Sequence, residues 1–166
     1  LPVSSFNPEM DLIKLATDGL KRKGLSDNKE YSDRLQRELD VICKKGYAPY
    51  FLVLKKSVDA LYSKQLLGFG RGSAVGSLCL YCLDITGVDP VKNHLLFERF
   101  LSENRNDNPD VDLDTSNREF SLEILKDTFG EDRVVGITNY NTLQLKSLIK
   151  DLSKFYEIPF QEVNAV

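Results

Sequence analysis

The sequence has few cysteines and no long apolar run, and each of these absences excludes a class of protein. Its three cysteines, Cys43, Cys79 and Cys82, are too sparse and odd in number for a disulfide scaffold. No uninterrupted apolar stretch approaches the roughly 18–20 residues of a membrane-spanning helix, and no secretory apolar region opens the chain. We therefore expect a protein of the reducing cytoplasm that has no membrane partner.

The sequence also lacks the basic excess of most DNA-coating proteins. It has 22 Lys and Arg against 25 Asp and Glu, a net charge of −3. Because each neutralised phosphate releases counterions, proteins that bind nucleic acid mainly through phosphates are usually basic. The charge balance argues against a simple DNA-coating module and is compatible with an enzyme that gathers acidic residues around a metal ion. A chain of 166 residues holds one domain or one lobe of a larger protein, and its first residue, Leu1, suggests a processed chain or an excised fragment.

Local signals predict helices that alternate with strands in the second half of the chain. Asn7 followed by Pro8 is a favoured helix start, and Gly24 and Gly130 are expected to end two helices. Helices are predicted over residues 8–23, 32–45, 50–65, 90–101, 116–129 and 142–158, and strands over residues 111–114 and 133–138. This order of elements predicts an α/β or α+β fold.

An acidic segment is the first of two features that can carry chemistry. It reads Pro-Asp-Val-Asp-Leu-Asp over residues 109–114. On a strand, Asp110, Asp112 and Asp114 would share one face, with neighbouring carboxylates roughly 6–7 Å apart. A divalent cation would remove their mutual repulsion, and a pair of ions could activate a hydroxyl and stabilise a leaving oxygen. A solvated edge strand or an acidic turn is the alternative, whereas a calcium loop is excluded because its glycine and closing Glu are missing.

A glycine cluster at residues 68–77 is the second feature. Glycines allow the backbone to approach a phosphate closely, and amides at a helix start attract negative charge. Ser73 would add a hydroxyl donor, and Arg71 would add a fork of donors. The cluster matches neither the P-loop pattern nor the dinucleotide-binding pattern, so a structural turn is the alternative. A phosphate-binding loop and a metal-binding carboxylate segment are together the two halves of a nucleotidyl-transfer site.

Four blocks of the sequence are recognisable as a set. They read Gly-Arg-Gly-Ser-Ala-Val-Gly-Ser-Leu (70–78), Asp-Ile-Thr-Gly-Val-Asp-Pro (84–90), Leu-Leu-Phe-Glu-Arg-Phe-Leu (95–101) and Pro-Asp-Val-Asp-Leu-Asp (109–114). In order and spacing they resemble the bacterial C-family replicative DNA polymerases, the family of the DNA polymerase III α subunit (DnaE type). The resemblance covers most of the chain.

The resemblance implies a fold and a reaction. The fold is the palm of the polymerase-β-like nucleotidyltransferases, a mixed sheet with flanking helices. Gly72 and Ser73 would bind the triphosphate of the incoming deoxynucleotide, and Asp110 and Asp112 would be the catalytic ligands of two Mg²⁺ ions. The implied reaction is template-directed nucleotidyl transfer from a dNTP to a primer 3′-hydroxyl by two-metal catalysis.

The resemblance also implies further site residues and partners. It places Arg71 and Arg105 near the nucleotide, Asp114 as an accessory acid and Lys146 at a lysine position of the family. The implied partners are primer–template DNA, the dNTP, the thumb and fingers of the polymerase, and replisome subunits.

The same likeness suggests a division of the chain into three parts. Residues 1–66 would form an N-terminal helical part, residues 67–158 the palm core, and residues 159–166 the start of a thumb or a linker. The third catalytic aspartate of the family lies on a later strand. We therefore expect a palm-centred fragment or a split gene product that is catalytically silent alone.

The residues themselves are also compatible with two other functions. One is a stand-alone nucleotidyltransferase, which would need a third carboxylate such as Glu131, Asp132 or Asp151. The other is a non-catalytic module that serves as a docking surface in a replisome. Coupled binding of a metal ion and a dNTP would separate an active site from such a module.

Overall fold

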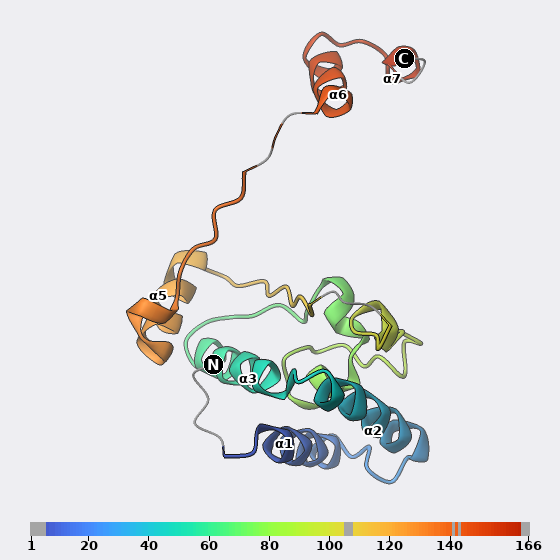
Figure 1. Cartoon of the computed structure of the whole chain (residues 1–166), viewed down its shortest axis with the longest axis vertical. Helices are drawn as coiled ribbons and strands as arrows, with labels where there is room; N and C mark the ends of the chain where they lie inside the picture. The colour runs from blue at the N-terminus through green and yellow to red at the C-terminus, as the bar shows by residue number, and fades with distance from the viewer. Residues whose placement is uncertain (1–5, 105–107, 141, 143, 164–166) are drawn as a thin grey trace. The chain divides into compact units, whose positions relative to one another are not determined.

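The protein is helical over the part of the chain that the computed structural model describes, which is residues 6–104, 108–140, 142 and 144–163. Figure 1 shows the helices in chain order. They are α1 (Pro8–Arg22), α2 (Lys29–Lys44), α3 (Ala48–Tyr62), α4 (Leu78–Cys82), α5 (Arg118–Phe129), α6 (Leu145–Phe155) and α7 (Phe160–Val163), with short 3₁₀ helices η1 (Gly72–Gly76), η2 (Phe97–Arg99) and η3 (Glu131–Arg133). The chain divides into two compact units, Leu1–Val134 and Val135–Val166.

The predicted ends of two helices are confirmed. The Asn7 side chain accepts a hydrogen bond from the amide three residues on, Pro8 occupies the first turn of α1, and the chain leaves the helix through Gly24 at φ +69°. Likewise, Asn117 caps α5 through the amide three residues on, and the helix ends at Gly130 with φ +104°. The signals of the four predicted residues (Asn7, Pro8, Gly24 and Gly130) are local, which explains why the sequence alone predicts these helix ends.

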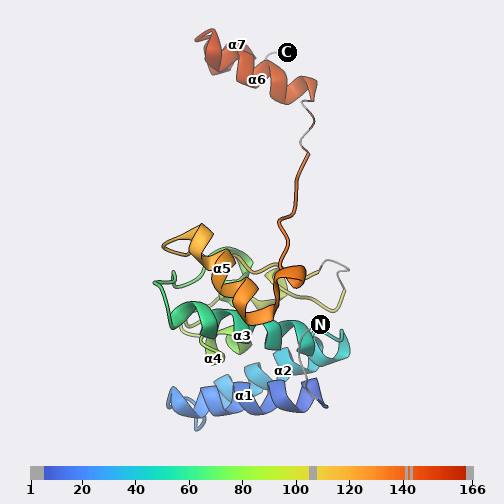
Figure 2. The ribbon, with the colours of Figure 1, turned by 90° about the vertical axis from the view of Figure 1, so that its left-hand side faces the viewer.

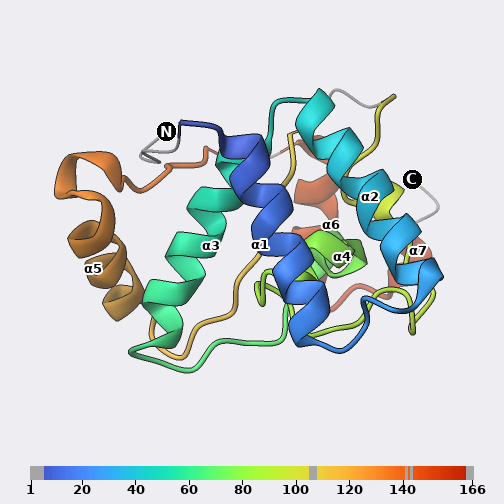
Figure 3. The same ribbon diagram turned by 90° about the horizontal axis from the view of Figure 1, so that it is seen from below.

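The core of the first unit is built around α1. This helix contacts α2, α3 and α4 (Figure 3), and α5 packs against the other side of α3 (Figure 2). At Gly19, α1 meets α4 so closely that an added Cβ would lie 2.0 Å from the Cys82 carbonyl oxygen. Edge-to-face aromatic contacts then join Phe100 to Phe51 of α3 and to Phe97 of η2. The residues around η2 are thereby fixed against the helices.

The palm fold of the polymerase-β-like nucleotidyltransferases, with its mixed sheet, is a wrong prediction. The described residues contain no β-strand and only one isolated antiparallel bridge, between Leu67 and Thr115. Residues 110–114 keep the expected alternation, because Val111 and Leu113 pack against the core while the aspartates are exposed. A sheet also needs neighbouring strands to complete its hydrogen-bond ladders, and among the residues described here the bridge at Thr115 is the one pairing next to the segment. The α/β or α+β expectation is therefore replaced by a helical fold.

Two other predicted elements also differ. The helix expected over residues 90–101 is reduced to the 3₁₀ turn of η2, and the positive φ of His94 (+53°) is incompatible with a continuous helix. The strand expected over residues 133–138 is absent from the described chain, where Val135 and Ile137 are 75% and 95% exposed. β-Branched residues favour a strand mainly through packing on a half-buried sheet surface, and these two bury little.

The second unit contains α6 and α7. The position of α6 confirms the helix predicted between residue 142 and Pro159. The predicted division at residues 66 and 158 stays a prediction. Among the described helices, none combines the length and apolar composition needed to span a bilayer.

Candidate functional site

The acidic segment is anchored at both ends. At its start, the Tyr47 hydroxyl at the beginning of α3 donates a hydrogen bond to Asn108 Oδ1 (3.0 Å). At its end, the Gly68 amide donates to the Asp114 carbonyl oxygen (2.9 Å), next to the Leu67–Thr115 bridge. The two apolar side chains between the aspartates pack inward, so the three carboxylates project into solvent. Their position is therefore determined by the backbone and the core.

The glycine loop adjoins this segment. Gly70 and Gly72 both have positive φ, +104° and +65°, which favours glycine because a side chain is strained there. A Cβ added to Gly72 would lie 3.0 Å from Asp112 Oδ2, and one added to Gly70 would lie 3.1 Å from Thr86 Cγ2. At Gly72 the loop therefore lies so close to the acidic segment that a side chain would press against Asp112.

Arg71 connects the loop to the carboxylates. Its Nη1 lies 3.1 Å from Asp114 Oδ1, and its Nε lies 4.0 Å from Asp112 Oδ2. The hydrogen bond and charge of Asp114, followed by the charge of Asp112, raise the pKa of the Arg71 guanidinium. All three side chains are more than half exposed, so these ion pairs contribute little to stability. They show that the carboxylates already attract a cationic group.

A pocket of about 450 Å³ opens beside the loop. Its lining joins the loop to the chain around η2 and consists of Gly72, Ser73, Val75, Gly76, His94, Leu95, Leu96 and Arg99. Ser73 and Arg99 are exposed, so a hydroxyl and a guanidinium are available to an anion there. Sequence reasoning assigned no role to Arg99, although it lies within the third recognised block.

Asp110 lies at the start of the acidic segment and is exposed. Burial raises the pKa of the nearby Tyr50, and the negative charge of Asp110 raises it further. Among the described residues, no three His, Cys, Asp or Glu side chains are grouped so that they could hold a metal ion. A pair of carboxylates still fits Mg²⁺ chemically, since this ion commonly takes one or two carboxylates together with substrate phosphates and water.

The remaining predicted site residues belong to other elements or fall outside the described part of the chain. Arg105 lies outside the described residues. Lys146 belongs to α6 in the second unit, as does Asp151. Glu131 and Asp132 belong to η3, where Glu131 pairs with a lysine of α5 at 3.6 Å. Neither Glu131 nor Asp132 lines the pocket.

Sequence analysis missed a buried acid behind the loop. Glu38 of α2 is 0% exposed and receives hydrogen bonds from Arg34 Nε (2.6 Å), the Ser77 hydroxyl (2.9 Å) and the amides of Leu78 and Cys79 (both 3.0 Å). Burial raises the pKa of Glu38, and the hydrogen bonds from Cys79, Leu78 and Arg34 oppose the rise. A signal for it exists in the sequence, because helical spacing puts Glu38 on the same face as the apolar residues Leu35 and Ile42.

Comparisons with known proteins agree on one family. Residues 10–166 match the family model described as the bacterial DNA polymerase III alpha NTPase domain. The chain is 39% identical over 156 residues to DNA polymerase III subunit alpha of Aquifex aeolicus (strain VF5), covering 90% of this chain and 13% of the relative. It is 36% identical over 173 residues to the same subunit of Yersinia pestis (95% and 15%), and 38% identical over 162 residues to that of Ureaplasma parvum serovar 3 (93% and 17%).

The family model covers nearly the whole chain, so the chain is of the class of proteins that carry this bacterial NTPase domain. The chain belongs to the bacterial DNA polymerase III alpha family, which confirms the resemblance of the four sequence blocks. It spans only 13–17% of the length of these three relatives.

Proposed function

We propose that this chain carries the triphosphate-binding loop and two metal-binding carboxylates of a DNA-directed DNA polymerase centre. The observation that supports this most is the approach of Gly72 to Asp112, where an added Cβ would lie 3.0 Å from the carboxylate. Arg71 spans the same gap through its two ion pairs. One nucleotide with its metal ion could therefore contact the loop and the carboxylates together.

The proposed roles follow from the chemistry of each side chain. Gly72 and Ser73 would bind the β- and γ-phosphates through a backbone amide and a hydroxyl, and Arg99 would add donors from the facing side of the pocket. Asp110 and Asp112 would hold Mg²⁺, which when bound lowers the pKa of the primer 3′-hydroxyl and neutralises triphosphate charge. With the carboxylates engaged, Arg71 would turn its guanidinium to a phosphate oxygen.

The proposal assigns to this chain only part of a polymerase centre. Its relatives are named as polymerase subunits several times its length. Primer–template DNA, the thumb and fingers and other replisome subunits are proposed partners on that basis. We also propose that the chain alone does not extend a primer, since Asp110 and Asp112 are its two proposed metal ligands and its described residues contain no group of three.

An NMR titration of the 166-residue chain tests the proposal. We expect dATP with MgCl₂ to shift the backbone amides of residues 72–77 and 110–114, and dATP with EDTA to shift them much less. Asp112→Asn should abolish this metal dependence. Asp18→Asn, at an exposed position of α1, should leave it unchanged.

The alternatives predict different results. A non-catalytic replisome module would give no coupled response to metal ion and nucleotide, and that result would overturn the proposal. Nucleotide transfer by the chain without a template would instead favour a stand-alone nucleotidyltransferase. Loss of the response in Asp18→Asn as well would show that the effect is not specific to the acidic segment.

A further inference from the structure

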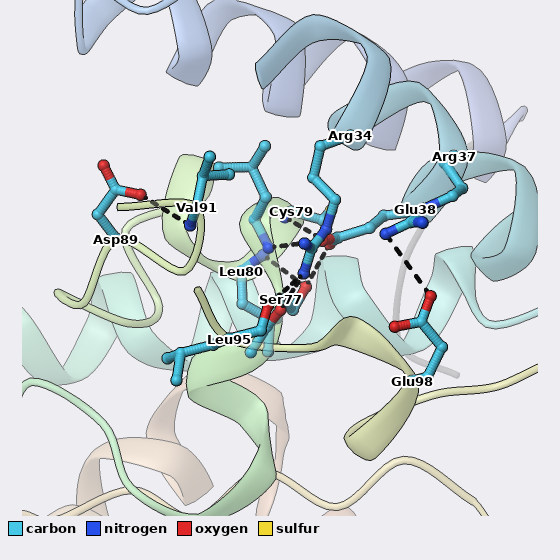
Figure 4. Close-up of polar contacts among 12 residues, drawn as sticks. Arg34, Arg37, Glu38, Ser77, Cys79, Leu80, Asp89, Val91, Leu95 and Glu98 are labelled. Carbon is cyan, nitrogen blue, oxygen red and sulfur yellow. Dashed lines mark hydrogen bonds and ion pairs between the residues drawn. The ribbon is translucent and has the colours of Figure 1, made fainter. Parts of the chain in front are cut away.

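The pocket has two walls, the glycine loop (residues 72–76) and the chain next to η2 (residues 94–96). Two side chains of α2 connect them. Figure 4 shows Arg34 and Glu38 directed toward Ser77 and Leu95. Arg34 Nη2 donates hydrogen bonds to the carbonyl oxygens of Gly76 (2.8 Å) and Leu95 (3.0 Å). Gly76 ends the 3₁₀ helix of the glycine loop, Leu95 belongs to the facing wall, and both line the pocket. One guanidinium therefore sets the separation of the two walls.

Glu38 holds that guanidinium in place. Arg34 Nε donates to Glu38 Oε1 at 2.6 Å, and the two side chains are only 14% and 0% exposed. The remaining acceptor capacity of Glu38 is used by Ser77 and the first amides of α4, directly after the loop. The guanidinium fork is planar, so fixing Nε also fixes the direction of Nη2. The loop is thereby bonded to α2 through both residues.

The walls have little freedom to move independently. A Cβ added to Gly76 would lie 2.7 Å from the Leu96 carbonyl oxygen, so the two backbones are already in contact there. Movement of the loop away from this wall would lengthen the two hydrogen bonds of Arg34. A buried polar group that loses its partner is costly, and this penalty opposes the movement.

We propose that Arg34 and Glu38 are positioning residues for the nucleotide pocket. They hold residues 72–76 at a fixed distance from residues 94–96, so that the loop amides and the Ser73 hydroxyl meet the phosphates without rearrangement. Neither side chain contacts the nucleotide. This inference rests on the proposed function, because it assumes that the pocket receives a triphosphate.

A stabilising role alone would not explain such a pair. Removing two charges from water costs free energy that offsets much of their mutual attraction. A buried ion pair is therefore weak evidence of a stabilising role. Its geometry is specific, however, because one planar group reaches two backbone carbonyls at once. The test must therefore separate nucleotide affinity from folding stability.

The comparison uses Arg34→Lys in the 166-residue chain. Lysine keeps the charge but lacks the planar fork that joins Glu38 to two carbonyls. We expect a circular dichroism spectrum like that of the wild type and affinity for dATP with MgCl₂ weakened by about tenfold or more. The amides of Gly76 and Leu96 should shift even without nucleotide. Gln36→Ala is the matched control, since Gln36 lies on the same helix, is exposed and bonds only to Asp40 among the hydrogen bonds found for it (2.8 Å).

Chemical rescue gives a readout that loss of stability would not produce. In Arg34→Ala, ethylguanidinium should restore part of the dATP affinity, whereas ethylammonium should not. If the lysine or alanine variant does not fold, Glu38→Gln serves instead, because it preserves the side-chain shape while removing the charge that fixes the guanidinium. We expect the same loss of affinity there.

The outcomes distinguish this inference from the proposed function. If the wild type binds dATP with MgCl₂ and a folded Arg34→Lys or Glu38→Gln variant binds it equally well, the positioning role is wrong and the proposed function survives. If the wild type does not bind at all, the proposed function fails, and this inference fails with it. Equal weakening by Gln36→Ala would also overturn the positioning role.

Discussion

Replacing Gly72 by alanine would test the contact between the glycine loop and the acidic segment. The new Cβ would lie 3.0 Å from Asp112 Oδ2. The side chain of Asp112 is 55% exposed, so the carboxylate can rotate away at little energetic cost. We therefore expect the substitution to displace the proposed metal ligand without a large loss of stability.

Gly24 provides a matched control for the backbone strain. Its φ of +69° is close to the +65° of Gly72, but nothing lies within 4 Å of an added Cβ. Alanine in the left-handed region costs about 1–2 kcal/mol, and the lower entropy of the unfolded chain returns about 0.4–1 kcal/mol. Each variant should therefore lose about 1 kcal/mol, which lowers the melting temperature by about 2–4 °C for a chain of this size.

The two variants should differ in ligand binding. We expect Gly72→Ala to weaken binding of dATP with MgCl₂ by about tenfold or more, because a small misplacement of a ligating group is costly. Gly24→Ala should bind like the wild type. Thermal unfolding measures the stability, and the amide titration of residues 110–114 measures the affinity. Equal affinity in both variants would refute the reasoning, and a stability loss above about 3 kcal/mol in Gly72→Ala would show that Asp112 cannot move aside.

Three further predictions concern packing and charge. Gly19→Ala should destabilise the protein by about 3 kcal/mol, because the added Cβ would lie 2.0 Å from the Cys82 carbonyl oxygen. Urea unfolding measures this loss, and a value below about 1 kcal/mol would contradict the contact. A thiol reagent should modify Cys43 alone in the native protein. Cys79 and Cys82 are fully buried, and burial raises the pKa of Cys82 to about 12. Fast reaction of all three thiols would contradict the packing. Burial alone would raise the pKa of Asp84, but two basic residues at the end of α1 lower it below its ordinary value. The stabilisation from Asp84 is thus present above the unfolded-state pKa and lost as pH falls through the folded-state pKa. The stability difference between wild type and Asp84→Asn should therefore vanish in acid, and a difference independent of pH in urea unfolding would be inconsistent with these ion pairs.

Helix ends were predictable because their signals are local. Asn7 and Pro8 act within one turn, and Gly130 provides the positive φ at which α5 ends. The alternation of the acidic segment was also predictable, since the inward packing of Val111 and Leu113 follows from their spacing. The functional roles of the aspartates and of the loop stay predictions.

Whether a sheet forms, and which groups bond to the buried ion pair, both depend on residues far apart in the chain. The sequence alone predicted neither of them correctly. An extended segment becomes part of a sheet only when neighbouring strands pair with it, and within the described chain residues 110–114 have beside them only the bridge between Leu67 and Thr115. Arg34 bonds to carbonyl oxygens 42 and 61 residues away in the chain. The charge of Glu38 on a buried helix face was visible, but its partners were not.

The hydrogen bonds around Glu38 also constrain how the sequence can diverge. Arg34 Nε and the Ser77 hydroxyl both donate to this carboxylate, so loss of Glu38 would leave both donors without this acceptor. We therefore expect these three positions to change together during evolution. A relative with an apolar residue at the position of Glu38 should also have lost the arginine and the serine, and an alignment of many family members would reveal this as covariation.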